Sequence, residues 1–173
     1  MNHVAILFLC AATVDASVNV PWEKEPTSVI GMTLGAPLPT TIPDCPGDWH
    51  AAPPLCVYAR SNPKANGILL GLAGLPFPGL NVRGQVVVFE GNVAVIKLYV
   101  SHDDYGRLKD VLIGQYGQST MTEGGGARPG TEKLIWGGRK SSLAYTESSD
   151  QAGLSVAAFF DNTLMSRFWG LRD

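Results

Sequence analysis

The sequence predicts an α+β fold in which an antiparallel sheet of about five strands carries one main helix and a short C-terminal helix on one face. Two observations predict this core over residues 83–173. Runs of β-branched and aromatic residues are separated by turn residues, which is typical of strands. One segment repeats its apolar residues at helical spacing. The five strands are expected over residues 85–89, 93–100, 133–136, 142–146 and 154–160.

An irregular, proline-rich arm is expected ahead of the core, over residues 17–82. Eleven of the twelve prolines lie before residue 83, and proline interrupts both helices and sheet ladders. A short strand at residues 57–60 and a buried strand at residues 67–75 are the regular pieces predicted within it. The second of these, GILLGLAGL, has an exposed partner-binding patch as its alternative interpretation.

The first two core strands are expected to form a hairpin. Gly91 and Asn92 form the predicted two-residue loop, because glycine takes the positive φ at the first position of a type II′ turn. This loop sets Val87 opposite Ile96 and makes one face almost wholly apolar. The opposite face includes Lys97, so it is expected to be half covered.

The main helix is expected directly after this hairpin. Ser101 is a suitable N-cap, Leu108 and Leu112 recur at helical spacing, and Gly117 is placed to end the helix. Asp161 is the predicted cap of the short C-terminal helix. These charged and polar residues are therefore explained by helix capping.

Residues 1–16 are predicted to be a signal peptide. Residues 4–12 form a continuous apolar run that is too short to span a bilayer, which needs about 18 residues. Val14 and Ala16 are small enough for the −3 and −1 positions of a cleavage site. A buried first strand is the alternative. The signal predicts a location in the periplasm or outside the cell, with no integral membrane segment after cleavage.

Cleavage of the signal peptide would remove Cys10 and leave two of the three cysteines, Cys45 and Cys56. Export therefore favours a disulfide between them, because an even number of cysteines in an oxidising compartment is typical of disulfide pairing. The bond closes a 12-residue loop and is worth about 2–3 kcal/mol by loop entropy. The competing interpretation is a metal site that adds His50 and His102. Its C-x4-H-x5-C spacing matches no compact zinc module, so we expect no metal and no cofactor.

Several segments resemble small exported Gram-negative proteins of unknown function. LKDVLIGQYGQST, LIWGG and SLAYTES are similar to a module in which a helix ends in a Tyr-Gly turn and a strand with a central tryptophan follows. GMTLGAPLPTTIPDCP resembles the opening of periplasmic proteins with a paired downstream cysteine. The order of elements is similar to β-lactamase-inhibitor-protein-like folds. The chain departs from the pattern at Ser119, near which the pattern has proline. The resemblance implies a fold and a compartment but no catalytic residues.

Known catalytic motifs are missing from the sequence, which has no G-x-S-x-G elbow, no H-E-x-x-H and no phosphate-binding loop. A net charge of −2 disfavours nucleic acid as a partner. We therefore expect a non-catalytic exported protein that binds another protein, as an inhibitor, immunity or envelope-assembly factor. Trp49, His50 and Arg128, in two loops, are the residues expected to reach that partner.

Two other functions stay open at this point. A small periplasmic hydrolase or metal-dependent enzyme would use His50 and His102, and it requires these side chains to converge in one cleft. A structural or ligand-carrier role is the third possibility, and the apolar segment at residues 67–75 favours it.

Overall fold

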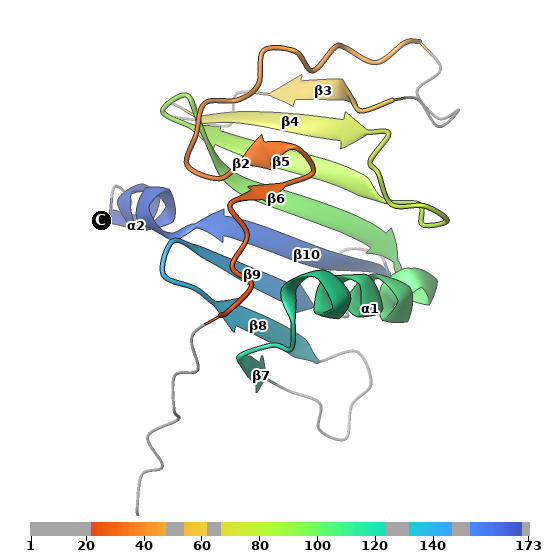
Figure 1. The fold of residues 1–173 in the computed structure, drawn as a ribbon. Coiled ribbons are helices and arrows are strands. Elements are labelled where there is room, and N and C mark those ends of the chain that lie inside the picture. Colours follow the sequence, from red (N-terminus) through yellow and green to blue (C-terminus); the bar gives the residue numbers. More distant parts are fainter. Residues whose placement is uncertain (1–21, 48–53, 62–66, 124–131, 147–152, 171–173) are drawn as a thin grey trace, which may run out of the picture.

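The structure is a computed structural model that describes residues 22–47, 54–61, 67–123, 132–146 and 153–170. An eight-stranded antiparallel sheet with the order β3-β4-β5-β6-β10-β9-β8-β7 forms its centre (Figure 1). The strands are β3 (Cys56–Ser61), β4 (Gly67–Ala73), β5 (Arg83–Phe89), β6 (Asn92–Ser101), β7 (Met121–Glu123), β8 (Lys133–Gly137), β9 (Ser141–Thr146) and β10 (Leu154–Asp161). The helices are η1 (His102–Asp104), α1 (Tyr105–Tyr116) and α2 (Asn162–Gly170).

The predicted α+β class and antiparallel sheet are confirmed, but the expected number of about five strands is wrong. Strands β3 and β4 lie within the stretch predicted to be irregular, and they extend the sheet from β5. At the other edge, the short strand β7 pairs with β8. Leu70 and Leu72 of β4 are fully buried, so β4 contributes to the same core as the predicted strands.

The two helices pack on opposite faces of the sheet, which corrects the prediction that both lie on one face. Leu108 and Leu112 of α1 belong to the main core cluster together with Ile96 of β6. Leu164 of α2 packs instead with Val95. Because neighbouring residues of a strand point to opposite faces, these two contacts place the helices on different sides.

The loop of the β5–β6 hairpin lies one residue earlier than predicted. Glu90 and Gly91 are its central residues, with φ angles of 51° and 81°, and two positive φ values are typical of a type I′ turn. Val86, rather than Val87, therefore faces Ile96. A shift of one residue exchanges the two faces of a strand, so the predicted assignment of β5 side chains to faces is wrong.

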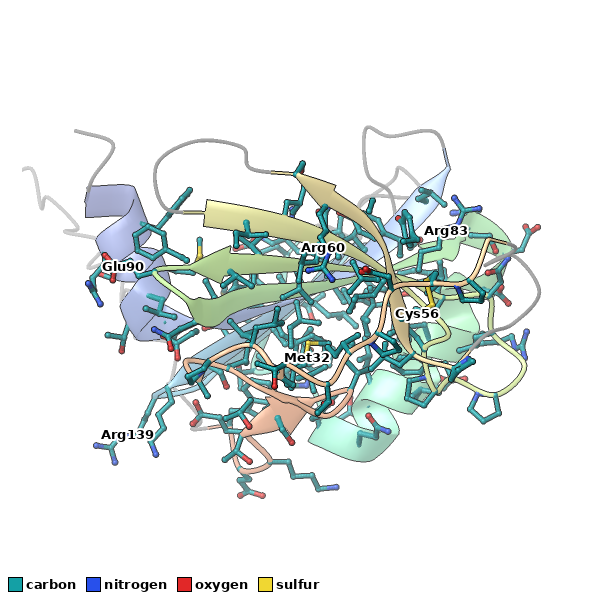
Figure 2. The ribbon with its side chains drawn as sticks, turned by 90° about the horizontal axis from the view of Figure 1, so that it is seen from above. Met32, Cys56, Arg60, Arg83, Glu90 and Arg139 are labelled. Carbon is teal, nitrogen blue, oxygen red and sulfur yellow. A yellow bond between two sulfur atoms is a disulfide. The ribbon has the colours of Figure 1, made fainter. Side chains whose placement is uncertain are left out.

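A segment that we call the strap, residues 22–45, crosses one face of the sheet beside α1 (Figures 1 and 2). It includes a small hairpin of β1 (Ser28–Val29) and β2 (Met32–Thr33). Three of its apolar side chains are buried in the main core: Trp22, Val29 and Met32. The proline-rich segment thus completes the core, and we call the face beneath it the covered face.

Backbone hydrogen bonds fasten the middle of the strap to the sheet. The Gly35 N–H donates to the carbonyl of Val93 at 2.9 Å, and the Val93 N–H donates to the carbonyl of Ala36 at 2.8 Å. Further towards the amino terminus, the indole Nε1 of Trp22 donates to the carbonyl of Tyr116 at 2.8 Å. The strap is therefore held both to β6 and to the end of α1.

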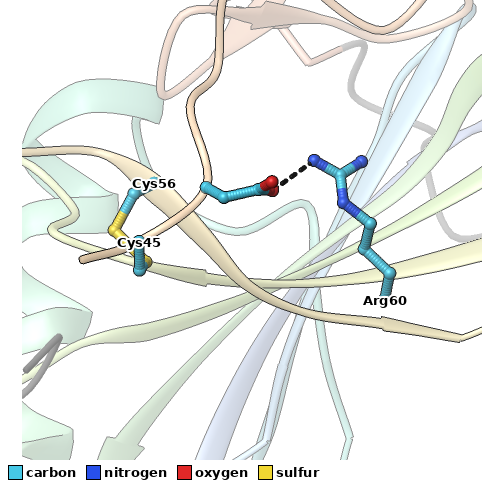
Figure 3. The surroundings of a disulfide bond; sticks show 4 residues. Cys45, Cys56 and Arg60 are labelled. Atoms are coloured by element: carbon cyan, nitrogen blue, oxygen red, sulfur yellow. Dashed lines mark hydrogen bonds and ion pairs between the residues drawn. A yellow bond between two sulfur atoms is a disulfide. The ribbon is translucent and has the colours of Figure 1, made fainter. Parts of the chain in front are cut away.

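The disulfide between Cys45 and Cys56 is present, as predicted, with a Cα–Cα distance of 4.9 Å (Figure 3). It joins the end of the strap to the start of β3. Beside it, Arg60 and Asp44 form an ion pair at 2.7 Å. Both side chains of this pair are mostly exposed, so the covalent bond is the main restraint at this edge.

Candidate functional site

The face of the sheet opposite the strap, which we call the open face, has little cover from the described residues. Among the described elements, α2 packs on this face at the end near the β5–β6 turn. Leu164 there contacts a small cluster that includes Phe89 and Val95. Most strand residues farther from α2 on this face are half-buried or exposed, whereas Gly71 and Ala158 are buried, and together they form the candidate site.

Strand registers connect seven positions on the open face into one line, and Tyr58 extends the line across β3 because its ring lies against Gly71. We call this line the open-face row, and it consists of Tyr58, Gly71, Gln85, Lys97, Ala158, Ala144, Ile135 and Met121. Since neighbouring strands lie about 4.8 Å apart, the row spans about 34 Å. It crosses the strands at right angles and includes one residue from each of them.

Side chains of the row differ in size. Ala158 and Ala144, on the neighbouring strands β10 and β9, are small, whereas Tyr58 and Met121, at the two edges of the sheet, are large. Tyr58 is 38% exposed and Met121 is 48% exposed. A Cβ atom on Gly71 would lie 2.6 Å from the Tyr58 ring, so the ring rests directly on the backbone of β4.

A second line of residues beside the row adds a tyrosine and an arginine. Arg83 faces Tyr99 in the β5–β6 pair, and the Tyr99 hydroxyl donates to Oε1 of Gln85 at 3.0 Å. Burial raises the pKa of Tyr99, and the proximity of Tyr58 raises it further. The Tyr99 hydroxyl therefore remains a hydrogen-bond donor at neutral pH and fixes the orientation of the Gln85 amide.

The described strand residues of the open face carry more positive than negative charge. Arg83, Lys97 and Lys133 are its basic residues, and Glu123 is its acidic one. Glu123 pairs with Lys133 at 3.0 Å. Lys97 is half-buried and has no ion-pair partner among the described residues. A cation without a counter-charge therefore sits in the middle of the row.

A second polar cluster lies on the covered face, where the carboxylate of Glu25 in the strap binds the turn between β8 and β9. It accepts the backbone N–H groups of Arg139, Lys140 and Ser141 at 3.1, 2.6 and 2.5 Å, and the Ser141 hydroxyl at 3.2 Å. Burial opposes the charged form, but these hydrogen bonds outweigh it and hold the pKa of Glu25 below its usual value. The cluster fastens the strap.

A pocket of about 550 Å³ adjoins this cluster and includes Lys140 and Asp161 in its lining. Both carboxylates of the pocket already have structural roles. Glu25 holds the β8–β9 turn, and Oδ1 of Asp161 accepts the Leu164 N–H at 2.8 Å, which confirms Asp161 as the predicted cap of α2. We therefore favour the open face over this pocket as the functional site.

A third cluster fixes α1 to the start of β8. Lys109 and Tyr105 each donate to Oε2 of Glu132 at 2.7 Å, and these two bonds hold the pKa of Glu132 below its usual value despite partial burial. The Tyr105 ring also stacks on Tyr145 of β9, with ring centroids 4.8 Å apart. Both the Glu132 hydrogen bonds and the stacked tyrosines hold α1 against the sheet, so we assign this cluster a structural role.

The residues that the sequence singled out for partner binding lie outside the described residues: Trp49, His50 and Arg128. His102 is described and is exposed in η1. The enzyme hypothesis requires His50 to meet His102, so it stays untested. Within the described ranges, no group of three or more His, Cys, Asp or Glu side chains is arranged to hold a metal ion.

The open-face row was not foreseen as a site, although one signal for it was present. Lys97 stands in a strand that is otherwise rich in valine and isoleucine, which indicated a half-covered face. The other members of the row are small or neutral residues in strands far apart in the sequence. Only the pairing of the strands brings them into line.

Comparison with known protein families, with curated proteins and with solved structures gives no match. The resemblance to β-lactamase-inhibitor-protein-like modules therefore stays a prediction. None of the described helices is both long enough and apolar enough to cross a membrane. The disulfide is compatible with a periplasmic or extracellular location.

Proposed function

We propose that this chain is an exported, non-catalytic protein that binds another protein through the open face of its sheet. The observation that carries the proposal is the open-face row, a line of eight residues across the sheet on the face that α1 and the strap do not cover. An inhibitor, an immunity protein or an assembly factor would use such a surface.

The composition of this face supports a protein partner. Tyrosine and arginine are enriched among the residues that dominate binding energy in protein interfaces, and Tyr58, Tyr99 and Arg83 all lie here. Exposed methionine, as at Met121, adapts to the shape of a partner. A standard interface buries about 800 Å² on each partner, about 28 Å across, and the length of the row accommodates it.

The rigidity of the face also supports this role. The covered side of the same strands is packed with fully buried side chains such as Ile96, Leu98 and Phe159. A surface that is already ordered loses little conformational entropy when a partner docks. The proposed site therefore lies on a sheet that packing on the other side holds in place.

Site-specific photo-cross-linking tests this proposal. A photoreactive amino acid replaces Ala144 or Met121 on the open face, or Asp110 on the exposed side of α1 as the control. The chain is produced in cells that naturally make it, and cross-linked species are identified by mass spectrometry. We expect one discrete protein adduct from the two open-face positions and none from position 110.

Absence of a discrete adduct from positions 144 and 121 would exclude the open face as the binding surface. Adducts of equal yield from all three positions indicate non-specific contact. An adduct from position 110 alone places the partner on the covered face, beside α1. Thermal unfolding of each variant, compared with the parent chain, shows that the substitutions leave the fold intact.

A further inference from the structure

We infer that the partner presents an acidic side chain to Lys97, and beside it apolar side chains that cover Ala158 and Ala144. This inference rests on the proposed function and names the chemistry of the partner's surface. The partner is therefore a protein segment in which aspartate or glutamate lies next to apolar residues.

The position of Lys97 is the first step of the argument. Its neighbours within the row are Gln85 on β5 and Ala158 on β10. Lys97 is half-buried and lacks an ion-pair partner among the described residues. A docking partner would remove the remaining water from its ammonium group, and an unpaired buried charge is costly. A carboxylate on the partner offsets that cost.

The hydrogen-bonding groups beside Lys97 point to the same chemistry. Oε1 of Gln85 accepts from the Tyr99 hydroxyl, which leaves Nε2 as the free end of the amide. Nε2 is a donor, and the Lys97 ammonium has donors only. Two adjacent side chains of the row, Gln85 and Lys97, thus offer hydrogen-bond donors. An ionised carboxylate has only acceptors, so it complements this pair.

The remaining residues of the row distinguish a protein segment from other anions. Beyond Lys97 the row continues through Ala158, Ala144, Ile135 and Met121, which have no polar side-chain groups for a phosphate backbone. Binding to nucleic acid needs a track of basic residues. The row has one cation, Lys97, beside an apolar stretch, which fits a protein surface of mixed character.

Charge also argues against a second copy of this chain on the same face. In a two-fold symmetric dimer the same patch meets itself. Lys97 of both copies would then lie in one interface, and like charges brought together oppose association. A different, acidic partner avoids this repulsion.

The test measures capture from position 144 in the cells that naturally make the protein, in four backgrounds. These are the parent chain, Lys97→Glu, Lys97→Arg and Lys24→Glu. Lys24 is an exposed lysine of the strap, so Lys24→Glu makes the same change of net charge away from the open face. The cross-linked peptide of the partner is sequenced by mass spectrometry.

We expect Lys97→Glu to lower the yield of the adduct about tenfold or more, because like charges then face each other. Lys97→Arg and Lys24→Glu should leave the yield within about twofold of the parent. The captured segment should contain aspartate or glutamate next to apolar residues.

Each other result overturns the inference in a recognisable way. A discrete protein adduct that Lys97→Glu does not weaken refutes the acidic contact and leaves the proposed function in place. An adduct with a second copy or with nucleic acid refutes the acidic protein partner. If position 144 captures nothing beyond what position 110 captures, the proposed function fails and the inference fails with it.

Discussion

The carboxylate of Glu25 accepts the backbone N–H of Ser141 at 2.5 Å, although 116 residues separate the two in sequence. Two further backbone N–H groups and one hydroxyl bind the same carboxylate. A single side chain of the strap thus satisfies most donors of the β8–β9 turn. The strap and the turn should consequently stabilise each other.

Replacing Glu25 by glutamine should lower the free energy of unfolding by about 1–3 kcal/mol, because hydrogen bonds to a charged acceptor are lost or weakened. Urea unfolding at neutral pH measures this change. Glu23→Gln is the matched control, since Glu23 is exposed on the same segment. Equal effects of the two substitutions would contradict a specific role for Glu25.

The contribution of Glu25 should also depend on pH. Its pKa is lowered in the folded protein, so the unfolded chain takes up a proton first as the pH falls. The stabilisation is complete above the ordinary glutamate pKa and is lost as the pH drops through the lower, folded value. The difference in stability between the parent and Glu25→Gln should therefore shrink in an acid series from about pH 7 to about pH 2. A constant difference would refute this linkage.

Gly138→Ala should destabilise the protein by about 1–3 kcal/mol. An added Cβ would lie 2.5 Å from Cδ of Glu25 and 2.6 Å from the carbonyl oxygen of Ser141. Because the substitution disturbs the same contact, its effect should be less than additive with that of Glu25→Gln.

Gly114→Ala is the control for that substitution. Gly114 lies on the exposed side of α1, with nothing within 4 Å of an added Cβ. This change should stabilise the protein by about 0.5–1 kcal/mol, because alanine favours helix more than glycine does. Thermal or urea unfolding of both variants measures the contrast, and effects of the same sign would be inconsistent with the packing around Gly138.

Removing the disulfide with Cys45→Ala and Cys56→Ala should lower the free energy of unfolding by about 2–3 kcal/mol. Reductant should destabilise the parent chain by a similar amount and leave the double variant unchanged. Thiol titration of the denatured, unreduced protein provides an independent check. Reactive thiols at both positions would show that the bond does not form.

Gly71→Ala should impair partner capture with little effect on stability. The new methyl group would displace the Tyr58 ring, which lies 2.6 Å from that position, and the ring can move out into solvent. We expect unfolding free energy to stay within about 1 kcal/mol of the parent, whereas capture from position 144 falls severalfold. Tyr58→Ala should lower capture to a similar degree. Normal capture by both variants would remove Tyr58 from the proposed interface.

Local features of the fold could be predicted from the sequence because their causes are local. The spacing of Leu108 and Leu112, with Gly117 at the end, gives α1 within one residue of its observed C-terminal boundary. Asp161 caps α2 as predicted. The disulfide was predicted from the two cysteines that remain after cleavage of the predicted signal peptide. Alternating or continuous apolar runs located all five predicted strands.

Pairing between distant segments could not be predicted in the same way. The predicted loop at Gly91 and Asn92 was one residue off, and the observed turn at Glu90 and Gly91 exchanges the faces of β5. The strand at residues 67–75 was recognised, but its place in the main sheet depends on pairing with β5. No sequence pattern marks Glu25 as a ligand of backbone groups so far along the chain.

The sequence by itself determined the class of the fold, the positions of α1, α2 and the five predicted core strands, and the pair of cysteines, because periodicity, capping and composition act over a few residues. Tertiary structure alone decided which face each helix covers and how the strap closes the core. It also aligned Lys97 with small residues from three other strands, since a row across a sheet exists only once every register is set.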